Sequence, residues 1–89
     1  RALKVRPTQP QALYHLADLG YARGNYAQAK QYVIRLEGLT IPTAEMLWLA
    51  LRIERRLGDR NAEATYGQQL RRQFPDSKEA KALAAGVDE

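Results

Sequence analysis

Two segments of this 89-residue chain repeat each other at a spacing of 34 residues. Four identities and one aromatic pair recur at that spacing: Leu13 and Leu47, Gly24 and Gly58, Tyr32 and Tyr66, Leu36 and Leu70, Tyr14 and Trp48. A period of this length is typical of stacked helical hairpins, each too thin to bury its own apolar face. The repeat therefore predicts an all-α solenoid of antiparallel helix hairpins.

Apolar spacing and helix breakers divide the chain into helices. We expect Gly24 and Gly58 to end helices in the left-handed conformation, and Gly38 with the stretch that follows it to break the chain again. The predicted helices cover about 9–22, 26–38, 44–57, 60–73 and 77–85, after a helical remnant at 1–6.

Short polar residues mark the predicted helix starts. The expected caps are Thr8 with Gln11, Asn25 with Gln28, Thr43, Asp76 with Glu79, and Ser77. The last helix is rich in Lys, Glu and Ala, as suits a solvent-facing cap on an open stack.

Composition excludes several classes of function. The chain has no cysteine, which removes disulfides and thiolate chemistry. Its net charge of +4 could suggest nucleic acid, but most arginines fall in predicted last helical turns, where they offset the helix dipole. These arginines are Arg23, Arg35, Arg55, Arg56, Arg71 and Arg72. No nucleic-acid-binding motif accompanies them, so we expect no nucleic-acid partner.

The apolar and small residues match the tetratricopeptide (TPR) pattern. Leu13-x2-Leu16-Ala17 fills the first helix, and Ala29-x3-Val33 fills the second. The second repeat is looser, because strict register places Glu63 and Gly67 at the small and bulky positions. A turn one residue shorter would place Ala62 and Tyr66 there instead, and this reading is preferred, although Gly67 could mark a close helix contact. The expected domains are 1–9 (remnant of a preceding TPR), 10–43 (TPR), 44–76 (TPR) and 77–89 (C-terminal capping helix and tail).

Most of the chain, and its C-terminal end above all, resembles a more specific family. The run Tyr66-Gly67-x-Gln69-Leu70-Arg71-Arg72-x-Phe74-Pro75-x-Ser77 is similar to the closing repeat of the type IV pilus biogenesis and stability family, the PilF/PilW pilotins. Leu51-Arg52-Ile53 with Asp59-Arg60, and Ala17-Asp18-Leu19 with Ala29-x-Gln31-Tyr32, add to the resemblance.

This resemblance implies an outer-membrane lipoprotein that faces the periplasm and helps the pilus secretin assemble. The secretin or another pilus-assembly component would then be its protein partner. Its only membrane contact would be a lipid anchor near the N-terminus of a longer protein, of which this chain would be a C-terminal fragment. A cytoplasmic location is the alternative. Because the leading repeat would be incomplete, we also expect the fragment to self-associate.

Catalysis finds little support in the sequence. His15 has no second ligand or base at a matching spacing, and Asp18 one turn away favours a local ion pair or a surface contact. No phosphate loop or nucleophile motif is present, and Ser77 is expected to cap a helix. We therefore expect a non-enzyme with no metal and no cofactor.

A protein-binding face is the better candidate site. The first helix of each TPR hairpin lines the concave face, and aromatic and arginine residues there would anchor a partner. The candidate residues are Tyr14, Asp18, Tyr21, Trp48, Arg52 and Arg55. Tyr14 and Trp48 could instead pack between first helices.

Two further functions stay open at this point. One is a general TPR adaptor or co-chaperone unrelated to pili, and the other is a regulatory TPR portion of a protein whose enzymatic domain lies elsewhere. Asp18 and Arg52 occupy the positions of the asparagines that chaperone-type TPRs use to clamp a carboxylate, which counts against a co-chaperone.

Overall fold

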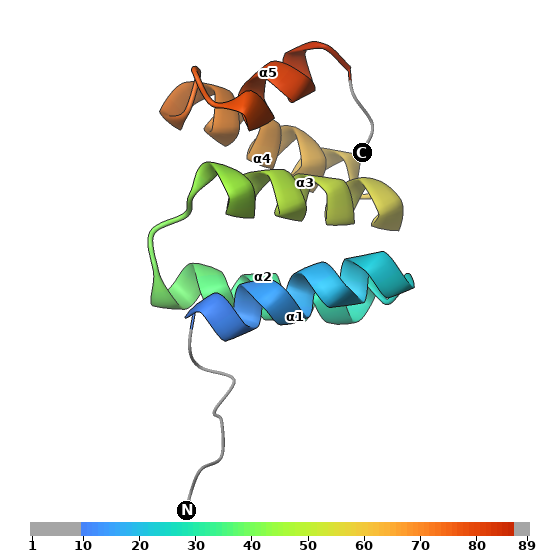
Figure 1. Ribbon diagram of the computed structural model, residues 1–89. Helices are drawn as coiled ribbons and strands as arrows, with labels where there is room; N and C mark the ends of the chain where they lie inside the picture. Colours follow the sequence, from blue (N-terminus) through green and yellow to red (C-terminus); the bar gives the residue numbers. More distant parts are fainter. Residues whose placement is uncertain (1–9, 87–89) are drawn as a thin grey trace, which may run out of the picture. The chain divides into compact units, whose positions relative to one another are not determined.

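The computed structural model describes residues 10–86. Within this range the chain forms five helices and no strand: α1 (Pro10–Arg23), α2 (Tyr26–Leu39), α3 (Ala44–Leu57), α4 (Arg60–Gln73) and α5 (Lys78–Ala84) (Figure 1). The prediction of an all-α, TPR-like fold is confirmed. The described residues divide into two compact units, 10–41 and 42–86.

The first unit is the hairpin of α1 and α2. Leu13 and Ala17 of α1 are fully buried, as is Ala29 of α2, and Val33 and Leu36 are nearly so. These positions follow helical spacing on each element, so the buried stripe on one helix meets that on the other.

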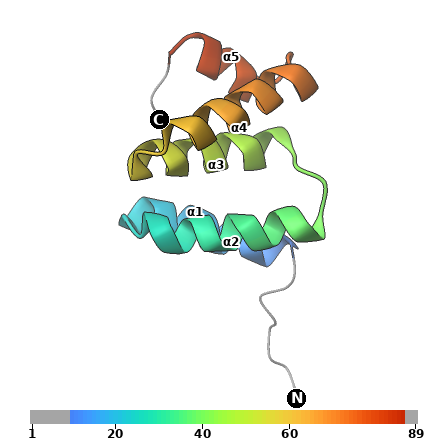
Figure 2. The same cartoon turned by 180° about the vertical axis from the view of Figure 1, so that it is seen from behind.

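The second unit contains the hairpin of α3 and α4, and α5 packs against both of these helices (Figure 2). Its core cluster is Leu47, Leu70 and Ala80, one residue from each helix. Partly buried side chains surround this cluster: Ala44, Trp48, Tyr66, Phe74 and Leu83. The short helix α5 thus covers part of the apolar face of the α3–α4 hairpin.

The two hairpin turns have the same backbone conformation and the same hydrogen-bond pattern. Gly24 and Gly58 both have φ of 85°, so the predicted left-handed helix ends are confirmed. After each glycine, the next amide donates to a carbonyl five residues back: Asn25 N to Gly20 O at 2.8 Å, and Asp59 N to Glu54 O at 3.0 Å. This closes the helix end and reverses the chain.

Three predicted helix starts are capped by side chains. Thr43 Oγ1 accepts from the amide of Met46 at 3.2 Å, and Ser77 Oγ accepts from that of Ala80 at 3.0 Å. Asp59 Oδ1 accepts from the amide of Ala62 at 3.0 Å. Each cap satisfies one of the amides that a helix start leaves without an internal partner.

Two predicted capping boxes are wrong. The side chain of Asn25 makes no cap hydrogen bond, because its ψ of 65° lies outside the extended region from which a cap reaches into the first turn. Asp76 with Glu79 does not cap α5, because Ser77 is the residue that directly precedes the helix. Thr8 and the predicted remnant at 1–6 lie outside the described residues.

Two predictions about α2 also need correction. Gly38 does not break the helix, which continues to Leu39 and ends at Thr40, whose amide donates to Leu36 O. Nothing lies within 4 Å of a Cβ built on Gly38, so the residue is on the open side of α2. Since the helix runs further than expected, Arg35 is not in its last turn.

The strict 34-residue register holds in the second hairpin. α2 and α4 begin two residues after Gly24 and Gly58 respectively, so the shorter turn proposed from the sequence is wrong. Gly67 is buried, and a Cβ on it would lie 3.4 Å from Leu51 Cδ1 and 3.4 Å from Leu83 Cδ2. Both would be ordinary contacts with side-chain methyl groups, so the alternative reading, that Gly67 marks a close helix contact, stays a prediction.

Candidate protein-binding surfaces

Tyr14, Asp18 and Tyr21 share one side of α1, since they are spaced by four and three residues. Asp18 is exposed, whereas the two tyrosines are half-buried. The ring of Tyr21 lies 5.5 Å from that of Tyr26 on α2 and is tilted by 60°. This aromatic contact holds one edge of the face in place across the hairpin turn.

Trp48 and Arg52 meet on α3. The guanidinium carbon of Arg52 lies 5.9 Å from the centroid of the Trp48 ring, within the range of a cation–π interaction. Trp48 also packs against the core cluster of the second unit, so only part of its surface can meet a partner. The structure thus brings two of the candidates on α3 together.

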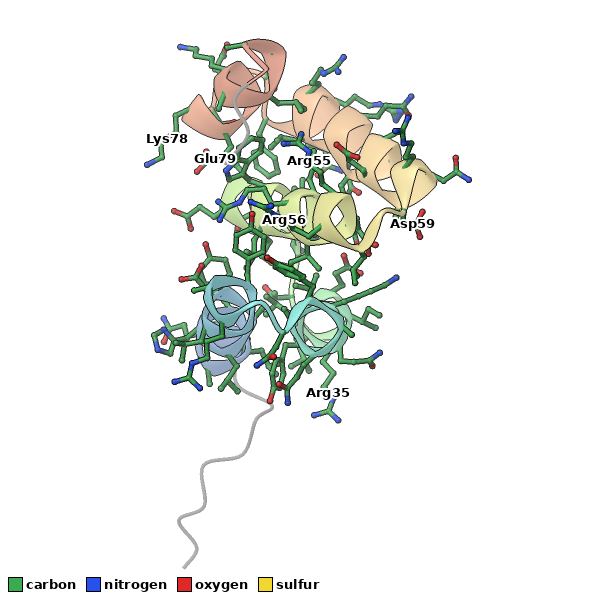
Figure 3. The ribbon with its side chains drawn as sticks, turned by 90° about the vertical axis from the view of Figure 1, so that its right-hand side faces the viewer. Arg35, Arg55, Arg56, Asp59, Lys78 and Glu79 are labelled. Atoms are coloured by element: carbon green, nitrogen blue, oxygen red, sulfur yellow. The ribbon has the colours of Figure 1, made fainter. Side chains whose placement is uncertain are left out.

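Arg55, the third candidate on α3, is tied to α4. Its Nε donates to Glu63 Oε2 at 2.8 Å, and both side chains keep about 30% or less of their surface exposed, at 30% and 27%. Figure 3 shows Arg55 where α3 and α4 face each other. That the α1 residues and the α3 residues form one concave face stays a prediction.

A groove of about 690 Å³ lies in the second unit. We call it the α4 groove, because most of its lining comes from one side of α4. The lining residues are Leu51, Arg55 and Gly58; Arg60, Glu63, Ala64, Gly67, Gln68 and Arg71; and Leu83. Its charged side chains are three arginines against one glutamate, which is the partner of Arg55.

Sequence reasoning assigned only Arg55 of this groove to a binding site. Arg71 was expected in a last helical turn, where it does lie, and Arg60 had no assigned role. The signal that could have found them is their spacing of 11 residues. Because a helix has 3.6 residues per turn, this spacing returns to nearly the same side after three turns.

The described residues contain no group of three or more His, Asp, Glu or Cys side chains that could hold a metal ion. His15 and Asp18 are both exposed. The helices of the described segment are also too short and too polar to cross a membrane. The longest helices have 14 residues, so each extends about 21 Å along its axis. The hydrocarbon core of a membrane is thicker, at about 30 Å.

Comparison with known proteins gives one consistent answer. The type IV pilus assembly protein PilF of Pseudomonas aeruginosa is 32% identical over 85 residues, which are 96% of this chain and 34% of PilF. A solved structure from the functional characterization of Pseudomonas aeruginosa PilF matches with a TM-score of 0.80 and 33% identity, over 89% of this chain and 36% of that one. No protein-family model matches the chain.

The resemblance drawn from the sequence is therefore confirmed by both sequence and structure. The chain spans about a third of the length of PilF, so the comparison covers the repeats described here and not the whole protein. Over that third of its length, PilF is similar to this chain in both sequence and TPR-like helical fold.

Proposed function

We propose that this chain is part of a non-catalytic scaffold that supports type IV pilus biogenesis by assisting secretin assembly in the outer membrane. The observation that carries the proposal is the likeness to PilF, at 33% identity and a TM-score of 0.80 over most of the chain. Helical hairpins of this kind present side chains on a rigid frame, which suits the binding of another polypeptide.

The first-helix residues are the surface proposed for this role. Aromatic rings and arginines contribute most to protein interfaces because they bury a large area and still form polar contacts. Tyr14 and Tyr21 of α1 supply the rings on one hairpin, and Trp48 with its stacked Arg52 supplies them on the other. Asp18, exposed between the tyrosines, adds a charge that would select a basic group on the partner.

A periplasmic location at the outer membrane belongs to the same proposal. It is supported by the role of PilF as a pilus assembly protein. Membrane attachment would come from a lipid anchor in the whole protein, and the repeats themselves would hold the partner. Fractionation of cells expressing the whole protein tests this location, and recovery from the cytoplasm would contradict it.

A segment exchange in PilF tests the function directly. The matching third of Pseudomonas aeruginosa PilF would be replaced by this chain, and the chimera expressed in cells that lack PilF. We expect pilus-dependent motility and assembled secretin to return. A chimera that is present at normal levels but restores neither would overturn the proposal, and would favour an adaptor unrelated to pili.

A charge reversal in the chimera locates the binding face. Asp18→Arg alters an exposed residue of the α1 face, while the control Gln31→Arg places the same side chain at an exposed position of α2, outside that face. If the first-helix face binds the partner, only Asp18→Arg lowers the amount of assembled secretin. Equal effects of the two variants would argue against this face.

A further inference from the structure

We propose that the α4 groove is a second binding site, which takes an acidic segment of a protein partner that also carries apolar side chains. This inference rests on the proposed role as a protein scaffold and adds the chemistry of what it holds. The groove lies within the second unit and shares only Arg55 with the first-helix residues considered above.

Charge is the first argument. Arg60 and Arg71 stand three helical turns apart on the same side of α4, and both are exposed. Arg55 also lines the groove, where its Nε donates to Glu63 Oε2 at 2.8 Å. An incoming carboxylate would therefore meet an excess of positive charge at both ends of the groove.

The floor of the groove is the second argument. Gly67 is buried between Leu51 of α3 and Leu83 of α5, and the next lining residue one turn back is the small Ala64. Small residues at these two positions keep the middle of the groove open. Ala64 is exposed and Leu83 is half-buried, so apolar side chains of a partner can lie on these two residues while its carboxylates reach the arginines along the rim.

Helix length explains why the groove is open. α4 has 14 residues and extends about 21 Å, whereas α5 has 7 residues and extends about 10 Å. α5 packs on the α3–α4 hairpin as the next helix of a repeat array would, but it is half as long. Leu83 is the one residue of α5 that lines the groove, so α5 itself covers only a small part of it.

A protein segment fits these features better than a nucleic acid does. The groove has an apolar floor and a carboxylate, Glu63, within its lining. A phosphate backbone would gain nothing from the floor and would be repelled by the carboxylate. Aromatic side chains on which bases could stack are absent from the lining residues.

Peptide binding to the 89-residue chain tests the proposal. The probe is a labelled, end-capped peptide of glutamate and leucine, long enough at about twelve residues to span the length of α4. We expect saturable binding by fluorescence anisotropy, and loss of binding when every glutamate of the probe is replaced by glutamine. Failure of the acidic peptide to bind would overturn this inference. It would not bear on the proposed role in pilus assembly, which the chimera tests separately.

A pair of adjacent arginines provides the matched control. Arg71→Glu changes the groove, whereas Arg72→Glu makes the same charge change on the neighbouring exposed residue, which does not line it. Both lie in the last turn of α4, so their effects on the helix dipole are alike. We expect Arg71→Glu to weaken binding about tenfold and Arg72→Glu by less than about twofold.

A second pair of variants controls for misfolding. Ala64→Glu adds a carboxylate to the groove, and Thr65→Glu adds it to the next exposed residue outside the lining. Only the first should weaken peptide binding. Equal losses within either pair would show general charge attraction and overturn the site, as would tighter binding of a single-stranded oligothymidine that depends on Arg71.

Discussion

Gly20 of α1 packs directly against Ala29 of α2 in the first hairpin. A Cβ on Gly20 would lie 3.2 Å from the Cβ of Ala29 and 3.4 Å from its Cα. Both residues are buried, and Ala29 is fully so. The two backbones approach this closely because neither side chain has more than one carbon.

This relationship predicts opposite outcomes for two helical glycines. Gly20→Ala should destabilise the chain, since its Cβ would be pressed against α2. Gly67→Ala should be neutral or stabilise it by up to about 1 kcal/mol, because its Cβ meets ordinary contacts and alanine favours a helix. Urea unfolding of both variants checks the difference, and a stabilising Gly20→Ala would contradict the packing argument.

The left-handed helix ends give a second prediction. Gly24 has φ of 85°, which is costly for any residue with a Cβ, although nothing lies within 4 Å of that position. Gly24→Val should therefore lower the free energy of unfolding by about 1–2 kcal/mol. Ala27→Val, at an exposed position in the same hairpin, is the control and should cost less. Thermal unfolding of the two variants measures the difference. Equal losses of stability would show that the backbone conformation of Gly24 does not matter.

Two residues one period apart should respond differently to loss of their side chains. Asp59→Ala removes the hydrogen bond to the amide of Ala62 and should cost about 1 kcal/mol. Asn25→Ala should cost clearly less, because the Asn25 side chain makes no cap bond. Chemical denaturation of the two variants measures the gap, and a larger loss for Asn25→Ala would refute the assignment of caps.

The side chain of Trp48 should contribute to the stability of the fold as well as to partner binding. Its ring packs against Leu47, Leu70 and Ala80, so Trp48→Ala is expected to lower the free energy of unfolding by about 2 kcal/mol, less than a fully buried tryptophan. Arg52→Ala should leave stability within about 0.5 kcal/mol and serves as the cleaner test of partner binding. An unchanged unfolding midpoint for Trp48→Ala would show that its ring contributes nothing to the core.

Self-association of the 89-residue chain stays a prediction. Leu19 of α1 and Ile34 of α2 are large apolar side chains that remain 38% and 47% exposed. Light scattering over a concentration series should show a mass that rises with concentration. Leu19→Glu should suppress that rise, and a mass that stays at one chain throughout would contradict the expectation.

The helices were largely predictable because their ends are encoded locally. Gly58, Thr43 and Ser77 each fix a boundary through their own backbone or hydroxyl group, and helices at 44–57 and 60–73 were placed as the structure has them. Asn25 was misjudged because its capping bond depends on a ψ value that residue type alone does not determine.

The α4 groove was not predictable by the same means. It depends on α5 ending early and on Leu51, Gly67 and Leu83 meeting from three different helices. The sequence shows Gly67 as a poor match to the repeat, and only the packed structure shows that Leu51 and Leu83 lie against it. Arg55 was placed on a candidate face from its helix position, but its bond to Glu63 required knowledge of how α3 lies against α4.

The short α5 also has a consequence for how such a protein can evolve. Leu83 is the one residue through which α5 reaches the lining of the α4 groove. A longer helix in the place of α5 would extend over the groove, and any arginine that it buried, such as Arg71, would then require a new partner. A longer α5 and an open groove would therefore exclude each other.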